Sequence, residues 1–339
     1  MREQIGVLGL GQCGGNIASL LESKGYTSVY VNTSTEDLNS IKGVHKIHIP
    51  HSEGAAKNRR KVLELATDSF GDIIQNITDI LTQKYIIVIF SASGGTGSGL
   101  STPTLRYLSQ IGKVCVPVVV IPDEDKEYAK SSENAFNLFV EIMNIQNLGA
   151  TFLLDNSRED KLTINQRFVN EFDAFININN SSVLGNIDVA ERKQMLSCPG
   201  VAVLSKLSKA KSSASEVVDS LHNGIYAKIE SKSAKYLAIS RSNRSLSIES
   251  IVKEIGSVYD VFSGISEATT VTMISGLQFP QKRIMQFKNR FEETVKNMND
   301  TINLDFTPLE PLKGLSFASS ATQPQSPASP RDILLNLMK

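Results

Sequence analysis

The chain has 339 residues, of which 41% are hydrophobic and 21% charged, and its 35 basic residues balance 35 acidic ones. Two domains of ordinary size fit this length, and the apolar content is sufficient for their cores, so wholesale disorder is excluded. A formal net charge of zero gives no bulk attraction to nucleic acid or to an anionic membrane. The three cysteines are far apart and no apolar run approaches the roughly 18 residues of a membrane span, so we expect a soluble cytoplasmic protein with reduced thiols.

Short apolar runs alternate with longer amphipathic ones in the first 160 residues. The apolar runs are predicted to be strands at residues 5–10, 28–31, 85–90, 114–121 and 151–154. Helices are predicted between them at residues 12–24, 56–82, 102–111 (with Pro103 in the first turn) and 132–148. This alternation indicates an α/β fold with an open, doubly wound, mostly parallel sheet, which binds ligands at the carboxyl ends of its strands.

The rest of the chain begins with a long predicted helix at residues 164–180, because Phe168, Phe172, Phe175 and Ile176 fall on one helical face. A second series follows, with strands predicted at 201–204, 236–240 and 269–275 and helices at 215–228, 248–262 and 281–299. The Ser/Pro/Gln-rich residues 319–330 are typical of a linker. The apolar cluster in residues 331–339 indicates either a frayed terminus or a short docking helix.

The first glycine-rich motif is Gly9-Leu-Gly11-Gln-Cys-Gly14-Gly15-Asn16, between a predicted strand and a predicted helix. Glycines let the backbone approach a phosphate closely, and the free N–H groups of a helix start favour an anion. In a nicotinamide-dependent oxidoreductase such a motif is followed, at the end of the second strand, by an acid that binds ribose. Here that strand runs into Asn32, Thr33 and Ser34, so the oxidoreductase hypothesis lacks its confirming residue.

The second motif, residues 93–99, holds four glycines and three hydroxyl residues directly after another strand. It nearly fits the P-loop pattern, but Leu100 stands where the lysine should be. We therefore expect a phosphate cradle whose charge is offset by Mg²⁺, by helix N-termini or by a residue from elsewhere. Lys57 or Arg59, in a third loop, could supply that charge, and a solvated helix start is the alternative explanation.

Two carboxylates, Asp188 and Glu191, stand three residues apart after the long predicted helix. On a helix they would share a face and could orient a water molecule or hold a hydrated metal ion. Taken alone, the pair is better explained as a solvent-facing helix start. We expect no protein-ligated metal site at His45, His48 and His51, because positions three apart point to opposite faces of a strand.

The order and spacing of these motifs resemble the tubulin/FtsZ superfamily of filament-forming GTPases over roughly residues 1–300. Residues 9–16 are similar to its first phosphate loop. Residues 93–99 are similar to its GGGTGTG signature, with Ser93 replacing the first glycine and Ser98 the second threonine. Residues 185–191 are similar to its catalytic loop. The substituted signature and the short chain look most like the TubZ branch, the DNA-segregation tubulins of plasmids and phages.

The resemblance implies that the chain binds GTP or GDP, with Mg²⁺, at residues that match the family's motifs. The nucleotide would be lined by Gly11, Gln12, Cys13 and Asn16, and its phosphates would be wrapped by Ser93, Gly94, Gly95, Thr96, Gly97 and Ser98. Gly54 and Ala55 would lie near the γ-phosphate, and Glu133 stands roughly where the family has a ribose-binding acid. The guanine edge would be read by Asn156 together with Asn179 or Asn180, of which Asn180 is the better match.

In the family the catalytic loop enters the nucleotide site of the next subunit. The resemblance therefore implies that Asn186, Asp188 and Glu191 complete GTP hydrolysis in a neighbouring copy of the chain, within a homopolymeric filament. It further implies plasmid or phage DNA partition through a DNA-bound adaptor protein, which the carboxyl-terminal tail could bind, with no direct contact to nucleic acid or membrane. An FtsZ-like role in cell division is the alternative, because residues 331–339 faintly resemble the adaptor-binding peptide of FtsZ.

Four parts of the chain follow from this resemblance. We expect a GTP-binding domain at residues 1–163 and a central helix with the catalytic loop at residues 164–198. A smaller α/β activation domain would occupy residues 199–300, and a linker and tail residues 301–339.

Overall fold

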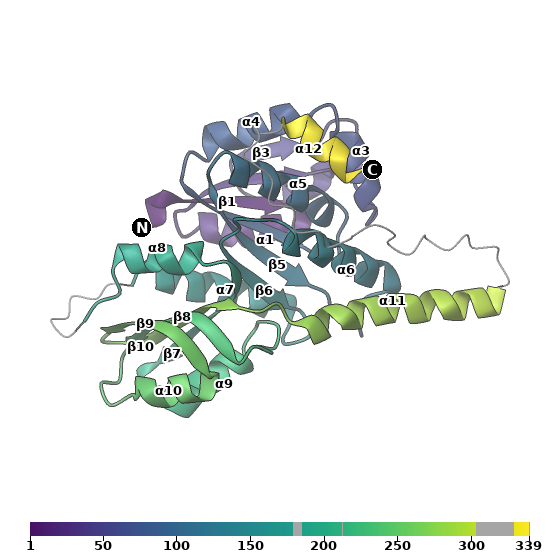
Figure 1. The fold of residues 1–339 in the computed structure, drawn as a ribbon. Coiled ribbons are helices and arrows are strands. Elements are labelled where there is room, and N and C mark those ends of the chain that lie inside the picture. The colour runs from purple at the N-terminus through teal and green to yellow at the C-terminus, as the bar shows by residue number, and fades with distance from the viewer. Residues whose placement is uncertain (179–184, 212, 303–328, 339) are drawn as a thin grey trace, which may run out of the picture.

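A computed structural model describes residues 1–178, 185–211, 213–302 and 329–338, and one ten-stranded sheet runs through it (Figure 1). The strands are β1 (Ile5–Leu10), β2 (Thr27–Asn32), β3 (His45–His48), β4 (Tyr85–Ser91), β5 (Val114–Ile121), β6 (Ala150–Asp155), β7 (Gly200–Ser208), β8 (Ser233–Arg241), β9 (Ser257–Ile265) and β10 (Thr269–Leu277). The helices are α1 (Gly11–Glu22), α2 (Thr35–Ser40), α3 (Arg59–Ala66), α4 (Phe70–Ile80), α5 (Thr96–Gln110), α6 (Ala129–Met143), α7 (Lys161–Ile176), α8 (Val189–Ser197), α9 (Ala214–His222), α10 (Ile248–Ile255), α11 (Gln281–Ile302) and α12 (Pro330–Leu337).

The amino-terminal half of the sheet is parallel, in the order β3-β2-β1-β4-β5-β6. Every residue of β1 and of β6 is buried, so helices cover both faces of the sheet, as the continuous apolar runs predicted. The doubly wound α/β class is therefore confirmed. Because the strands are parallel, all their carboxyl ends meet at one edge of the sheet, which we call the carboxyl edge.

The two strand–helix series share this one sheet, since β7 pairs in parallel with β6 and places Gly200 opposite Ala150. Beyond β7 the sheet becomes mixed: β10 is antiparallel to both β7 and β8, while β8 and β9 are parallel. The central helix α7 packs against β6, β7 and β10. Helix α7 therefore contacts strands of both the amino-terminal and the carboxyl-terminal half of the sheet.

Several sequence predictions of secondary structure are wrong in detail. The helix predicted at 248–262 ends at Ile255, where Gly256 takes φ +109° and lies so close to Lys232 that a Cβ would meet its carbonyl oxygen at 2.2 Å; strand β9 follows. The helix predicted at 56–82 is two helices, α3 and α4. Helix α5 begins at Thr96, so Pro103 lies inside it rather than in its first turn.

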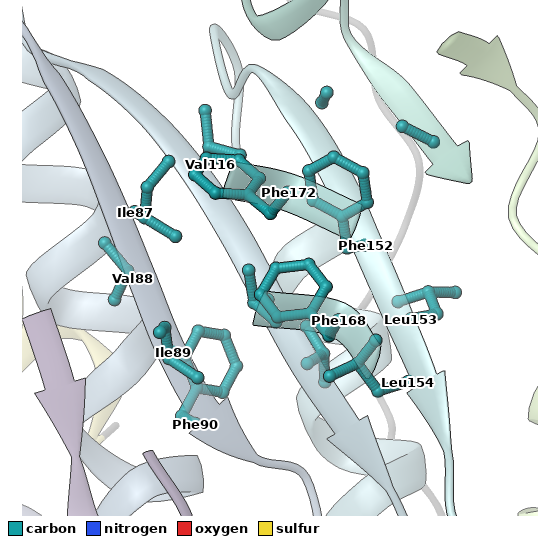
Figure 2. Close-up of a cluster of buried hydrophobic side chains, with 14 of the residues drawn as sticks. Ile87, Val88, Ile89, Phe90, Val116, Phe152, Leu153, Leu154, Phe168 and Phe172 are labelled. Carbon is teal, nitrogen blue, oxygen red and sulfur yellow. The ribbon is translucent and has the colours of Figure 1, made fainter. Parts of the chain in front are cut away.

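Aromatic side chains fill the space between the sheet and α7 (Figure 2). The ring of Phe152 in β6 lies 5.6 Å from that of Phe168 and 6.2 Å from that of Phe172, both on α7. Phe168, Phe172, Phe175 and Ile176 are all fully buried, which confirms the helical face predicted from their spacing. Burying such side chains contributes roughly 1.5–3 kcal/mol each, so this cluster fixes α7 on the sheet.

One acidic residue of α7 faces this interior. Glu171 is 6% exposed, and its Oε2 accepts a hydrogen bond of 3.0 Å from the Tyr226 hydroxyl. The Arg167 guanidinium lies 3.6 Å from the other oxygen. Burial raises the pKa of Glu171 to about 7, even though Arg167 and Tyr226 both favour the charged form.

We expect Glu171→Gln to stabilise the protein at alkaline pH. The folded pKa of about 7 exceeds the ordinary value of 4.5, so the folded state holds an extra proton between these values and loses that stabilisation as the pH rises through 7. A neutral amide avoids the loss and should raise the free energy of unfolding at pH 8 by about 2 kcal/mol, with little change at pH 5. Thermal unfolding of both proteins at the two pH values measures this, and parallel pH profiles would contradict it.

The carboxyl-terminal residues form a docking helix, as one of the two sequence alternatives predicted. Helix α12, yellow in Figure 1, packs against α4 and α5 of the same chain, with Ile333 and Leu334 buried. Arg331 lies 3.5 Å from Asp68, and Met338 accepts a hydrogen bond from Thr67. Most of the predicted linker, residues 319–328, lies outside the described residues. None of the helices within the described ranges is long and apolar enough to cross a membrane.

Candidate nucleotide-binding site

Two helices begin at the carboxyl edge of the sheet without a side-chain cap. Helix α1 starts at Gly11, directly after β1, and α5 starts at Thr96, five residues after β4. The two starts touch, because a Cβ on Gly11 would lie 3.0 Å from the backbone nitrogen of Gly97. The first N–H groups of a helix have no partner within the helix, so two adjacent uncapped starts form a strong anion-binding position.

Two glycines of the second motif, Gly97 and Gly94, have different roles. A Cβ on Gly97 would meet the carbonyl oxygen of Leu10 at 2.9 Å and the Cβ of Phe90 at 3.2 Å, so this glycine lets α5 approach β1 and β4. A Cβ on Gly94 would find only the side chain of Ser91, at 4.0 Å. Gly94 therefore borders open space at the helix starts, which is the space a phosphate group would fill.

The hydroxyl groups of this motif are engaged within the protein. Thr96 shares a hydrogen bond of 2.7 Å with Thr33, which follows β2. Ser98 donates to the carbonyl oxygen of Gly94, and Ser93 is 3.0 Å from Ser91. The residues after β2 thus support the glycine-rich loop, at the position where a nicotinamide-dependent enzyme carries its ribose-binding acid. Backbone N–H groups are left as the main donors to a bound phosphate.

The third loop lies directly on the second. Gly54 donates its N–H to the Thr33 carbonyl oxygen at 2.9 Å, and the Cβ of Ala55 is 2.5 Å from where a Cβ on Gly95 would stand. Both residues are therefore close to the glycine-rich loop and to the residues after β2 that support it. Ala56 and Lys57 take φ values of +45° and +58° in the turn that Asn58 closes, a conformation that costs a non-glycine residue about 1–2 kcal/mol.

Both candidate cations of this loop already have partners. Arg59, which is 13% exposed in its side chain, donates to the Ser98 carbonyl oxygen at 3.1 Å and to Glu141 at 2.6 Å. Lys57 donates to Glu127 at 3.2 Å and to Ser131 at 2.7 Å. Arg59 consequently braces the start of α5, and Lys57 connects the third loop to the loop after β5.

Sequence reasoning missed Asn134, which ties the loops together. Its side-chain amide donates to the carbonyl oxygens of Lys57 at 2.9 Å, Ser93 at 3.1 Å and Gly94 at 3.2 Å. The buried side chain of Asn134 thereby connects the third loop to the glycine-rich loop and fixes the distance between them. Its neighbour Glu133, the predicted ribose-binding acid, lies in α6 and forms an ion pair with Lys130 at 2.8 Å.

A different acid, Glu127, lies among these loops. Besides Lys57 it accepts a hydrogen bond from Ser131 at 2.7 Å, and Lys161 is 3.8 Å away. Burial opposes ionisation, but the Ser131 hydroxyl and the Lys57 charge outweigh it and hold the pKa of Glu127 below its ordinary value. Burial also raises the pKa of Cys13, in the first phosphate loop, to about 12, and the charges of Lys161 and Glu127 act on the same thiol. Cys13 is thus a neutral thiol, not a nucleophile.

Asn156 stands at the far end of the same edge, one residue after β6. It is 8% exposed, and its N–H donates to the Ile121 carbonyl oxygen at 3.2 Å. Its side-chain Oδ1 is buried with no hydrogen-bond partner within the described structure. An unsatisfied buried acceptor suits the N–H donors of a guanine edge. Asn179 and Asn180 lie outside the described residues.

The two predicted catalytic carboxylates form a capping box at the start of α8. Asp188 Oδ1 accepts the N–H of Glu191, and Glu191 Oε2 accepts the N–H of Asp188, each at 2.8 Å. This confirms a helix start, at which Asp188 is exposed and Glu191 is half-buried. Asn186 is exposed just before them. The buried Arg192, which sequence reasoning missed, holds the segment by donating to the carbonyl oxygens of Asp188 and Ile176.

These carboxylates lie at the opposite edge of the sheet from the loops just described. Helix α7 leaves the carboxyl end of β6 and runs back for 16 residues, about 24 Å, before β7 starts again beside the beginning of β6. Arg192 holds Asp188 at the end of α7, where the last residue is Ile176. In Figure 1, α8 accordingly lies at the left, whereas β5 and β6 point to the right. Asp188 cannot reach the phosphate position of its own chain.

The fold and the uncapped, glycine-lined helix starts define a phosphate-binding α/β domain. Residues 4–163 match the model of the Tubulin/FtsZ family, GTPase domain. Residues 4–163 therefore form a GTPase domain of the tubulin/FtsZ family, which binds GTP and GDP.

Individual relatives agree with this assignment. The chain is 29% identical over 303 residues to the tubulin-like protein TubZ of a Clostridium botulinum C phage, covering 86% of this chain and 84% of that protein. The solved structure of Clostridium botulinum phage c-st TubZ, with its carboxyl-terminal tail truncated, superimposes with a TM-score of 0.80 at 27% identity, over 87% of this chain and 99% of that one. A GTPγS-form protofilament of Bacillus thuringiensis TubZ shares the fold, with a TM-score of 0.74 at 18% identity over 87% and 93% of the two chains.

Proposed function

We propose that this protein is a self-assembling GTPase in which each subunit binds GTP at its carboxyl edge and the next subunit supplies the catalytic carboxylates. The observation that carries the proposal is the separation of the two groups on opposite edges of one sheet. A head-to-tail contact between copies would bring Asp188 of one subunit to the phosphates of its neighbour. Such an open contact produces a filament. The solved protofilament of the similar Bacillus thuringiensis TubZ supports this arrangement.

Within the pocket, we propose that Gly11, Gln12, Cys13 and Asn16 line the nucleotide and that Gly94 and the start of α5 hold the phosphates. Gly54 and Ala55, in the third loop, would lie near the γ-phosphate, and Asn156 would form hydrogen bonds with the guanine edge. Bound Mg²⁺ would neutralise phosphate charge. We propose that phosphate oxygens and water hold it, because no group of three or more His, Cys, Asp or Glu side chains suited to a metal gathers within the described ranges.

Asp188 is the proposed general base, which orients the attacking water, and Glu191 and Asn186 shape the loop that carries it. The carboxylate is exposed and therefore free to enter a neighbouring pocket once the subunits stack. Orientation by a positioned base contributes roughly 10²–10⁴-fold to the rate. Phosphoryl transfer needs little more than such positioning and the stabilisation of negative charge.

The biological task that we propose is partition of plasmid or phage DNA through a DNA-bound adaptor protein. The similarity to a phage TubZ supports it. Helix α12 is the proposed binding element for such an adaptor. It has eight residues and a side-chain cap, and a long spacer precedes it in the sequence.

The test of assembly-dependent hydrolysis is the concentration dependence of the rate. With GTP and Mg²⁺, light scattering should rise above a critical subunit concentration, and phosphate release per subunit should increase across the same range. With GDP, scattering should stay at the baseline. A rate per subunit that is constant from far below to far above the assembly threshold would contradict the shared active site.

A further inference from the structure

Helix α11 contacts the carboxyl edge of the sheet through one partly buried arginine, Arg283. The side chain of Arg283 is 12% exposed, and it donates to both oxygens of Asp155, from Nε and Nη2, at 3.0 Å each. It also donates to the Pro122 carbonyl oxygen at 2.9 Å and to Glu124. Arg283 thus joins the turn after β6 to the loop after β5.

Asp155, which accepts two hydrogen bonds from Arg283, directly precedes Asn156 in the sequence. Asp155 is 2% exposed, and its Oδ1 also accepts the N–H of Ser157 at 3.0 Å and the Ser157 hydroxyl at 2.7 Å. The Asp155 carboxylate therefore organises the turn on both sides of Asn156. The ion pair with Arg283 offsets the cost of burying this carboxylate.

The position of Arg283 is itself fixed by packing. Its guanidinium lies 4.8 Å above the ring of Phe287, and this ring stacks parallel on Phe139 of α6 at 6.3 Å. Phe287 is fully buried. The start of α11 is consequently clamped to α6, the helix that follows the loop containing Pro122 and Glu124.

Two acceptors beside this clamp have no partner within the described structure, namely Asn156 Oδ1 and Glu124 Oε2. Each belongs to one of the two segments that Arg283 joins. We propose that Arg283 is a positioning residue for guanine recognition, which acts by holding the Asp155 turn so that Asn156 Oδ1 faces the base. The proposal rests on the proposed function, in which Asn156 reads the guanine edge.

An arginine suits this task better than a lysine. The planar guanidinium donates two parallel hydrogen bonds to one carboxylate and still reaches a carbonyl oxygen, whereas an ammonium is a point charge. Arg283→Lys should therefore keep the buried charge balanced and the chain folded, while it releases the fixed orientation of the turn. Arg290→Ala is the matched control, because Arg290 is an exposed arginine on the same helix.

The experiment compares the equilibrium binding of GTP and of inosine triphosphate, which lacks the 2-amino group of guanine, below the assembly threshold. We expect Arg283→Lys to weaken GTP binding about tenfold and to lower the preference for GTP over inosine triphosphate. Arg290→Ala should bind both nucleotides as the wild type does. In an Asn156→Ala background, Arg283→Lys should have no further effect on the preference, because the residue through which it acts is gone.

Other outcomes separate the two proposals. If the wild type has no preference for guanine, or Asn156→Ala leaves it unchanged, the proposed role of Asn156 fails. If Asn156→Ala removes the preference but Arg283→Lys behaves like Arg290→Ala, only the present inference fails. It also fails if Arg283→Lys weakens both nucleotides equally, or lowers the preference as much in the Asn156→Ala background as in the wild type.

Discussion

Asp188→Asn should bind GTP as tightly as the wild type and form filaments that persist, while GTP hydrolysis falls by roughly 10²–10⁴-fold. Asparagine is chosen because it caps a helix as well as aspartate does, so the hydrogen bond to the Glu191 N–H survives. Only the negative charge that would orient the water is lost. Asp188→Ala should have the same effect on hydrolysis and cost about 1 kcal/mol of stability as well, through loss of the cap. Phosphate release and sedimentation of the same samples measure turnover and assembly together.

A mixing experiment tests whether the site is shared. Asp188→Asn retains an intact nucleotide pocket, and Asn156→Ala retains an intact catalytic loop. If neighbours complete each other's sites, filaments containing both variants should hydrolyse GTP faster than the average of the two separate preparations. Normal turnover by Asp188→Asn alone would show that the carboxylate is only the helix cap that the isolated subunit displays.

Local sequence patterns predicted much of this fold because the parallel strands are buried on both faces. The boundaries predicted for 5–10 and 114–121 match β1 and β5, where apolar residues run without interruption. Strand β9 was missed for the opposite reason. It is a partly exposed edge strand, and its mixture of polar and apolar residues after α10 imitates a continuing helix. Gly256, with its positive φ, marks the true end of that helix.

The candidate site was easiest to predict where glycine-rich backbone, rather than a distant side chain, forms it. Glycine-rich loops leave a local signature, so the segments 11–16 and 93–98 could be recognised and the structure brings them together. Asn134 and Arg283 act through hydrogen bonds to carbonyl oxygens and a carboxylate that lie 40 or more positions away in the sequence. A buried asparagine in a helix and an arginine in another helix have no distinctive spacing. Their roles follow from the packing of α6 and α11 alone.

Gly94→Ala should separate nucleotide binding from stability. The added methyl would contact only the Ser91 side chain, at 4.0 Å, and the backbone at Gly94 does not have a positive φ. Replacing a glycine at such a position restricts the unfolded chain, so the free energy of unfolding should stay the same or rise by about 0.4–1 kcal/mol. If a phosphate group occupies the open space, the same methyl will collide with it, at a cost of about 1–3 kcal/mol. We therefore expect nucleotide affinity to fall about tenfold to a hundredfold while the melting temperature of the free protein does not fall.

Gly97→Ala, three residues along the same loop, provides the contrast. Its methyl would press on the Leu10 carbonyl oxygen at 2.9 Å and on the Cβ of Phe90 at 3.2 Å, and neither the backbone of β1 nor that of β4 can rotate away. The free energy of unfolding should therefore fall by about 1–3 kcal/mol before any nucleotide is added. Thermal unfolding and nucleotide titration of both variants test this difference: Gly94→Ala should lose nucleotide affinity, and Gly97→Ala should lose stability. Wild-type nucleotide affinity in Gly94→Ala would mean that the phosphates do not lie against this loop.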